Sequence, residues 1–148
     1  MLILDSRRLL KENNMGNIRH TVVVRKDLQL VTGLLAAQVA HISDQFIRSA
    51  IINCQSGPVA KSFNPEFTQM AHEWFRSPYL SVLAVNCAED LNAVMEHAVS
   101  SGLQVHEWSD TIPSPTFPDR AIKVRVGISI GPDDFDKIKI VTGALPLY

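Results

Sequence analysis

Four polar side chains recur at helical spacing between residues 38 and 48, and they form the first group that could do chemistry. Gln38, His41, Gln45 and Arg48 would share one face of a helix, beside an apolar stripe at positions 35, 39, 42, 46 and 50. The functional interpretation is that Gln38 and His41 face a cleft. A solvated helix face with one histidine near the core edge explains the same spacing, and periodicity alone favours that simpler interpretation.

A second candidate is the run from Gly127 to Gly131, which matches the G-x-S-x-G nucleophile elbow. The elbow places its serine on a sharp strand-to-helix turn, and an acid and then a histidine follow along the chain. All five histidines of this chain, at positions 20, 41, 72, 97 and 106, precede Ser129. A strand that ends at Gly131-Pro132 explains the match better, so Ser129 is not expected to act as a nucleophile.

Metal and nucleotide motifs are absent from the sequence. His72-Glu73 lacks the second histidine of H-E-x-x-H, and His106-Glu107 has no local partner ligand. Neither G-x-x-x-x-G-K-[ST] nor G-x-G-x-x-G occurs, so no phosphate cradle is recognisable. We therefore expect no metal and no cofactor.

Basic side chains could gather into a local patch. Lys123 and Arg125 share the outward face of the last expected strand, and Arg25, Lys26 and Arg120 could join them to bind phosphate. Solubility is the commoner reason for exposed lysines. With 14 basic and 15 acidic side chains the net charge is −1, which argues against a general basic coat but not against such a patch.

The elements that must position these residues fit one α/β domain, because 148 residues can bury a core of their own. Residues 1–18 are interpreted as an N-terminal appendage and residues 19–148 as the domain. Apolar patterning predicts strands at residues 20–25, 80–85, 103–108 and 121–130, and helices at residues 34–54, 65–76, 87–101 and 133–138. This order predicts a small mixed four-stranded sheet flanked by helices, with Val22 and Val24 in a central strand.

Local signals predict where these elements end. Asn64 is a candidate N-cap for the helix that Pro65 begins, and Asn86 for the next helix, which Gly102 closes. Gly57-Pro58 should stop the first long helix. Prolines at 113, 115 and 118 are expected to exclude regular structure between residues 109 and 120.

Composition bounds the class of protein. Hydrophobic residues make up 46% of the chain and charged residues 20%, which are ordinary values for a globular protein. No apolar run approaches the roughly 18 residues needed to cross a bilayer, so no membrane association is expected. The two cysteines, Cys54 and Cys87, form no close-spaced motif, which favours free thiols in a reducing cytoplasm.

Several segments together resemble the type II peptidyl-tRNA hydrolase family over about residues 20–148. They are VVRKDL at 23–28, GLLAAQVAH at 33–41, IGP at 130–132 and VTGALPLY at 141–148. Asn64-Pro65-Glu66 with Trp74 is similar to the family's middle helix. The resemblance implies a mixed four-stranded sheet flanked by helices, often as a dimer. It also implies hydrolysis of the ester that joins a peptide to tRNA, without metal or cofactor.

Carried over position by position, the resemblance matches Arg25, Asp27, Gly33, Gln38, His41 and Asp110. The family's G-K-G-K loop, whose lysines are thought to serve the chemistry and the tRNA, reads VTGL at residues 31–34. Thr32 and Leu34 therefore replace both lysines. The family's D-A-G-R-T-Q segment reads DTIPSP at residues 110–115, so only its aspartate is kept.

Two hypotheses follow. The first is a divergent hydrolase of peptidyl-tRNA or a related aminoacyl ester, in which Asp110 is the base or orients the water. Thr32, Gln38 and the backbone amides near Leu34 and Leu35 are possible oxyanion donors. His41 completes the expected catalytic set, and Arg25, Lys26, Asp27 and Arg120 the substrate-binding set. The second hypothesis is a catalytically silent module that binds a small molecule or a protein.

A homodimer is also expected. The family that the chain resembles often forms dimers, and a second copy would bury the apolar C-terminal run at residues 144–148.

Overall fold

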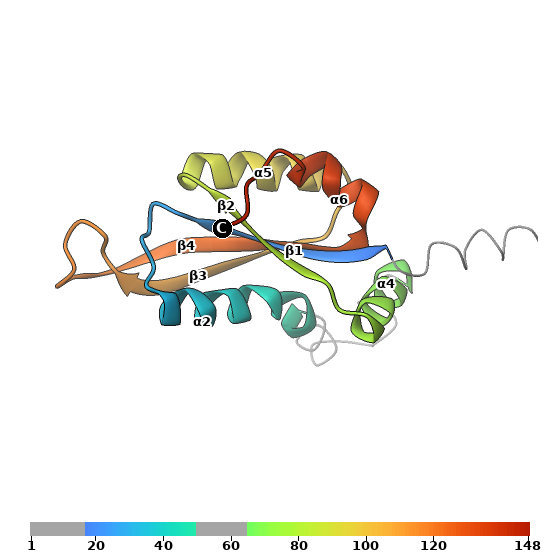
Figure 1. Cartoon of the computed structure of the whole chain (residues 1–148), viewed down its shortest axis with the longest axis horizontal. Coiled ribbons are helices and arrows are strands. Elements are labelled where there is room, and N and C mark those ends of the chain that lie inside the picture. The colour runs from blue at the N-terminus through green and yellow to red at the C-terminus, as the bar shows by residue number, and fades with distance from the viewer. Residues whose placement is uncertain (1–16, 50–64) are drawn as a thin grey trace, which may run out of the picture.

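Four strands form one mixed sheet, in the order β2-β1-β4-β3 (Figure 1). The computed structural model describes residues 17–49 and 65–148. The strands are β1 (Ile18–Arg25), β2 (Leu80–Val85), β3 (Val105–Pro113) and β4 (Ala121–Asp134). β1 pairs parallel with β2 and antiparallel with β4, and β3 pairs antiparallel with β4. The predicted mixed four-stranded α/β sheet is therefore confirmed.

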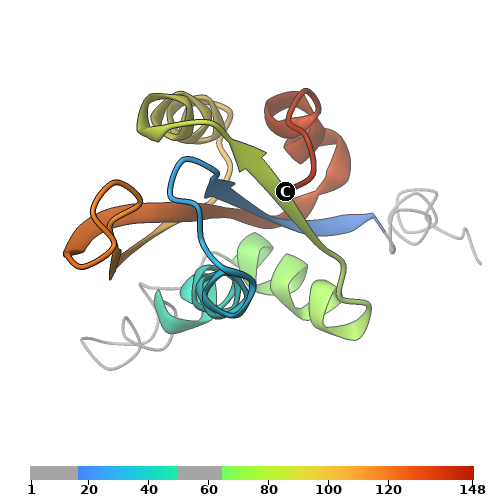
Figure 2. The same ribbon diagram turned by 60° about the vertical axis from the view of Figure 1, so that its left-hand side comes forward.

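Helices cover both faces of this sheet. α2 (Thr32–Ser43) and α4 (Pro65–Arg76) lie on one face, and α5 (Ala88–Ser100) and α6 (Phe135–Thr142) lie on the other (Figures 1 and 2). β1 lies inside the sheet, and Val22, Val23 and Val24 are fully buried. The prediction that Val22 and Val24 belong to a central strand is confirmed.

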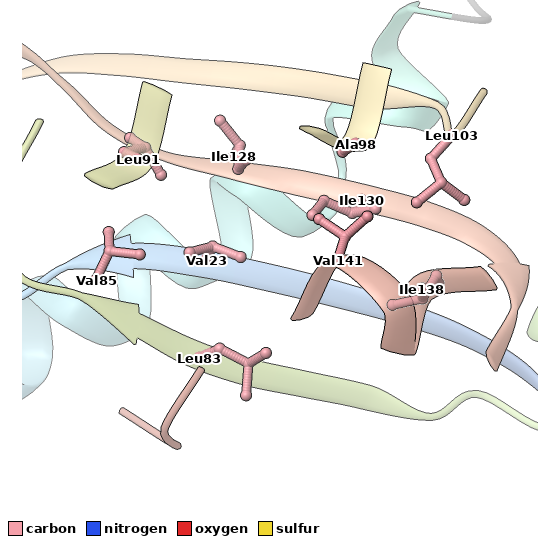
Figure 3. Packing of buried hydrophobic residues seen from close by; sticks show 10 residues of the cluster. All are labelled: Val23, Leu83, Val85, Leu91, Ala98, Leu103, Ile128, Ile130, Ile138 and Val141. Carbon is pink, nitrogen blue, oxygen red and sulfur yellow. The ribbon is translucent and has the colours of Figure 1, made fainter. Parts of the chain in front are cut away.

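The alternation of side chains along β1 divides the core into two layers. Val23 points toward α5 and α6, where it packs with Leu91, Ile128 and Ile138 (Figure 3). Val22 and Val24 belong to the opposite layer, beneath α2. The members of that second layer are Val22, Val24, Leu28, Ile42, Ile112 and Val126.

The helix predicted at residues 34–54 is interrupted at Asp44, and residues 50–54 of that span lie outside the described residues. α2 begins at Thr32 and ends at Ser43, a turn follows at Asp44, and residues 45–49 are helical again. The Ser43 hydroxyl donates to the Ala40 carbonyl (2.9 Å), and the Asp44 carboxylate accepts from Arg48 (2.9 Å). The Ser43 hydroxyl competes with the helical ladder for this carbonyl, whereas the Asp44–Arg48 pair, four residues apart, supports the helical segment that follows. The proposed stop at residues 57–58 and the proposed cap at residue 64 lie outside the described residues.

The prediction of irregular structure from residue 109 to 120 is wrong for its first part. β3 runs on to Pro113, and Ile112 pairs with Ile122 in an antiparallel ladder. Pro113 occupies the last ladder position, opposite Ala121, and the other two prolines lie in the connecting turn. Proline is tolerated at a strand end, so none of the three interrupts the pairing.

β4 also extends beyond its predicted end at Ile130. It continues to Asp134 because Asp133 and Asp134 pair with Arg19 and Ile18 of β1. α6 consequently begins at Phe135 rather than Asp133, and the Asp134 side chain accepts from the Asp136 amide (2.8 Å) as its cap.

Two of the remaining helix ends differ from the prediction: α6 ends at Thr142 rather than at residue 138, and the cap of α5 is not the predicted one. α4 begins at Pro65, and α5 is closed by Gly102 in the left-handed region (φ 76°). Asn86 is not the cap of α5. Cys87 occupies the cap position, and the Asn86 backbone amide instead donates to the Asp90 carboxylate (3.3 Å).

The C-terminal segment pairs with the outer edge of β2, where the C-terminus lies in Figure 1. Leu147 bridges to Leu83, and the Tyr148 amide donates to the Val82 carbonyl (3.0 Å). Leu145 packs against the core, whereas Leu147 remains 74% exposed. The chain thus covers part of its own apolar C-terminal run. No helix of the described residues is long and apolar enough to cross a membrane.

Candidate active site

The buried side chain of Gln38 joins α2 to β3. Its Nε2 donates to Oδ2 of Asp110 (2.8 Å), and its Oε1 accepts from Nε1 of Trp108 (2.7 Å). Gln38 is only 1% exposed. The interpretation of residues 38–48 as a solvated face is therefore wrong for Gln38, which points at the sheet instead.

The orientation of the Gln38 amide is determined by its two partners. An indole N–H can only donate, and an ionised carboxylate can only accept. Trp108 must therefore meet the amide oxygen, and Asp110 must meet the amide nitrogen. His41, one turn further along α2, stacks on Trp108 with ring centroids 4.8 Å apart and planes 22° apart. The four side chains form one contiguous unit.

Asp110 is held as an anion at the edge of this unit. Its second oxygen, Oδ1, accepts from the Thr111 amide (2.7 Å). The hydrogen bond from Gln38, then that from Thr111, hold the pKa of Asp110 below its usual range, and the charge of His41 acts in the same direction. Partial exposure leaves the carboxylate accessible to water.

Strand geometry explains why these groups meet. Trp108, Asp110 and Ile112 alternate along β3 and share the face toward α2. On β4, Gly127 lets the helix come close, since a Cβ there would lie 2.8 Å from Cδ1 of Ile42 and closer still to the Val23 carbonyl oxygen. A larger residue at position 127 would push α2, and Gln38 with it, away from β3.

Thr32 lies at the exposed start of α2. Val31 caps the helix without a side-chain hydrogen bond, and no acidic residue stands in the first turn. The Leu35 amide donates to the Val31 carbonyl (2.8 Å), so the expectation that it serves as an oxyanion donor is wrong. The amides of Thr32, Gly33 and Leu34 precede this first helical bond and point out of the helix end.

Arg25 is placed away from Asp110, on the side of the sheet that α5 covers. Its guanidinium forms a two-point ion pair with Asp27, with Nη2 to Oδ2 at 2.7 Å and Nε to Oδ1 at 3.0 Å. The Asp27 hydrogen bond raises the pKa of Arg25, and Glu89 at the start of α5 contributes to the same effect. Arg125 also turns to this side, where it contacts Asn92.

The other predicted substrate-binding residues do not gather into one patch. Lys26 is exposed in the loop after β1, and Arg120 is exposed in the β3–β4 turn, where it lies over the Phe117 ring. The structure thus brings together Gln38, His41 and Asp110, whereas Arg25, Lys26, Asp27 and Arg120 belong to two other places on the surface.

Ser129 lies fully buried in the middle of β4, between Val22 of β1 and His106 of β3. It is not on a strand-to-helix turn, so the G-x-S-x-G match is a strand sequence. Among residues 17–49 and 65–148, no three His, Cys, Asp or Glu side chains are grouped to hold a metal ion.

Trp108 was not identified as a site residue from the sequence. The sequence pattern predicts Trp108 as the last residue of its strand and Asp110 in an irregular segment. Once β3 extends to Pro113, the two-residue spacing of Trp108 and Asp110 puts both on the face toward α2. A buried indole N–H needs a hydrogen-bond acceptor, and this requirement is the signal that could have indicated Gln38 as the partner of Trp108.

A cavity of about 210 Å³ belongs to the other face of the sheet. It lies between α6 and the first residues of β1 and β2, and its lining includes Arg19, Phe135 and Lys139. None of the predicted site residues contributes to it.

Comparison with known proteins identifies the family. The model of the family described as peptidyl-tRNA hydrolase PTH2 matches residues 18–148. A peptidyl-tRNA hydrolase of Nanoarchaeum equitans (strain Kin4-M) is 29% identical over 132 residues, which cover 88% of this chain and 99% of that protein. The match spans the whole sheet and every residue of the Gln38–Asp110 unit. The chain belongs to the peptidyl-tRNA hydrolase PTH2 family.

Proposed function

We propose that this chain hydrolyses the ester bond of peptidyl-tRNA at the Gln38–Asp110 unit. The observation that carries the proposal is the anchored carboxylate of Asp110, which receives one hydrogen bond on each oxygen and stays accessible to water. An ester hydrolase needs a positioned water, a base and a donor for the oxyanion. Family membership supplies the substrate class.

Asp110 acts chiefly by orienting the water. A carboxylate whose pKa is lowered is a weak base, because efficient general bases have pKa values near the working pH. Each Asp110 oxygen keeps a lone pair for a water molecule beside its N–H partner. His41 in its neutral form, the form that does not add its charge to the field at Asp110, is the neighbouring group that accepts the proton, since histidine most often serves this role. Its stacking on Trp108 holds the imidazole in place.

The start of α2 supplies the oxyanion donors. Amide groups at a helix N-terminus stabilise negative charge, and those of Thr32, Gly33 and Leu34 are free of the helical ladder. At 1.5 Å per residue they lie about 6–9 Å from Gln38 along the helix axis. An ester held between Asp110 and the start of α2 can receive the water oriented by Asp110 and place its developing oxyanion at the amides of the helix end.

The turnover should be slow, because Thr32 and Leu34 occupy the loop positions at which the family resemblance places lysines. Loss of a single oxyanion donor lowers a rate by about 10²–10³. Loss of phosphate contacts weakens tRNA binding and flattens its salt dependence.

Asp110→Asn tests the role of the carboxylate with little change of shape. The measurement is release of free tRNA from purified peptidyl-tRNA. Asp136→Asn is the matched control, because Asp136 is exposed on α6 on the other face of the sheet. We expect Asp110→Asn to abolish turnover and Asp136→Asn to leave it unchanged. Equal turnover of the two variants would contradict the proposal.

The alternative is a silent binding module on the same fold. The replaced loop lysines favour it, since they remove charge from the position where the oxyanion would form. The Thr32→Lys/Leu34→Lys variant discriminates the two functions. Turnover that appears or rises in this variant supports the hydrolase. Turnover that is absent from both proteins supports the module.

A homodimer in the cytoplasm is also proposed. Leu147 stays exposed at the outer edge of β2, and a second copy could cover it. Sedimentation at high micromolar concentration tests this, and a pure monomer would contradict it.

A further inference from the structure

The turn that joins β3 to β4 carries an exposed aromatic ring with a cation on it. Phe117 is 54% exposed, and the Arg120 guanidinium lies 5.2 Å from the centre of its ring. Of the charged side chains at residues 114–123, two are cationic, Arg120 and Lys123, and one is anionic, Asp119. An exposed ring beside cationic groups is the combination that proteins use to stack nucleic-acid bases and hold the adjacent phosphates.

The turn is built to present this ring. The Ser114 hydroxyl is buried and accepts from the backbone amides of Thr116 (3.3 Å) and Phe117 (3.1 Å). The Arg120 amide donates to the Phe117 carbonyl (2.9 Å), and the Ser114 amide donates to the Arg120 carbonyl (2.8 Å). A large apolar side chain on a turn held by four hydrogen bonds loses little entropy when a ligand binds it.

The turn also lies within reach of the candidate active site. It continues β3 directly, and Pro113 lies three positions after Asp110, which is about 10 Å along a strand. Figure 1 shows the turn projecting from the end of the sheet at which α2 begins. Stacked nucleotides advance 3.4 Å each, so the distance from Asp110 to the start of the turn corresponds to about three of them.

We propose that the β3–β4 turn binds the single-stranded 3′ end of tRNA, with a base stacked on the free face of Phe117 and a phosphate at Arg120. The inference rests on the proposed function, because the ester to be cleaved is attached to that 3′ end. The turn positions the last nucleotides while the ester reaches Asp110. Phe117 and Arg120 lie two and five positions after the DTIPSP segment at residues 110–115, in the same turn.

The test compares binding of two RNA minihelices by the full chain, one with a single-stranded 3′ end and one with a blunt end. Phe117→Ala should weaken binding of the first by about 5- to 150-fold, the range of one base–aromatic stack, and leave binding of the second unchanged. Phe117→Tyr should restore binding. Phe75→Ala is the matched control, because Phe75 is also 54% exposed but lies on α4.

Kinetics give a second readout. With peptidyl-tRNA, Phe117→Ala and Arg120→Ala should raise KM and leave kcat nearly unchanged, because neither side chain touches the reacting atoms. The proposal is overturned if Phe117→Ala binds the single-stranded end as tightly as the wild type does, or if neither minihelix binds. Turnover without dependence on Phe117 would refute this inference alone. Binding that depends on Phe117 but brings no turnover would refute only the proposed hydrolysis.

Discussion

Replacement of Gln38 by leucine tests the unit at the centre of the candidate site. The two side chains are similar in size, so Gln38→Leu removes both hydrogen bonds with little change in packing. The Trp108 indole N–H loses its acceptor while the side chain above it becomes apolar. Asp110 loses the donor that chiefly lowers its pKa.

The structure sets the size of the effect. A buried donor without a partner costs about 1–3 kcal/mol, and the Trp108 N–H becomes one. The bond to the Asp110 carboxylate adds about 1 kcal/mol, because water can replace Gln38 at a partly exposed group. We expect Gln38→Leu to lower the free energy of unfolding by about 2–4 kcal/mol, a large share of the roughly 5–15 kcal/mol of a typical domain.

Urea unfolding at pH 7 measures this loss, with Gln69→Leu as the control. Gln69 is exposed on α4, where its side chain donates to Glu73 (3.1 Å). The same chemical change there should alter the free energy of unfolding by no more than about 0.5 kcal/mol. The slope against urea should stay the same in all three proteins, since the surface exposed on unfolding does not change.

The pH dependence gives an independent check. The folded-state pKa of Asp110 is lower than its unfolded value of 3.8, so the ionised carboxylate adds stability above that pH. This contribution disappears as the pH falls through the folded-state pKa. In Gln38→Leu the folded-state pKa rises toward its ordinary value, and less stability is lost in this acid range. A Gln38→Leu protein as stable as Gln69→Leu at pH 7 would refute the hydrogen-bond network.

Three further outcomes are expected. The Thr32→Lys/Leu34→Lys variant should cleave peptidyl-tRNA faster than the wild type in a tRNA-release assay, and no gain would argue against an oxyanion site at the start of α2. Gly127→Ala should lower the free energy of unfolding by at least about 1–3 kcal/mol in urea, because its Cβ would collide with the Val23 carbonyl oxygen. Burial lowers the pKa of His20 from 6.5 to about 4. Between these two pH values the unfolded chain therefore binds more protons than the folded protein does. The free energy of unfolding should fall by roughly 3 kcal/mol as the pH drops through this range. His20→Phe should flatten this fall, and an unchanged pH profile would show that His20 does not cause it.

The sequence alone was sufficient for most of the fold. The apolar run around Val22 and Val24 predicts a strand covered on both faces, because side chains alternate between the two faces and a continuous apolar run would leave one face apolar and exposed to water. Residues 65–76 and 80–85 were predicted with their observed bounds, since Pro65 and the Ser77-Pro78 pair act locally on the backbone. Signals of this kind depend on neighbours in the chain, and the sequence contains them.

The candidate site depended on distant neighbours. Gln38 and Asp110 are 72 positions apart, and helical periodicity could not tell whether Gln38 meets water or the sheet. Prolines predicted a loop after Trp108, but pairing with β4 extended the strand and brought Asp110 onto the face toward α2. A strand continues where a neighbouring strand satisfies its backbone hydrogen bonds. Which strand is the neighbour depends on the arrangement of the whole sheet and not on the local sequence.

What the sequence by itself determined is therefore the order of elements, the central strand and the family resemblance. The tertiary structure decided which polar groups meet. It joined Gln38, Trp108 and Asp110, and it turned Arg25 to the other face and into an ion pair with Asp27. The physical reason is that local backbone preferences act over a few residues, whereas a buried polar side chain must find its partner wherever packing places one.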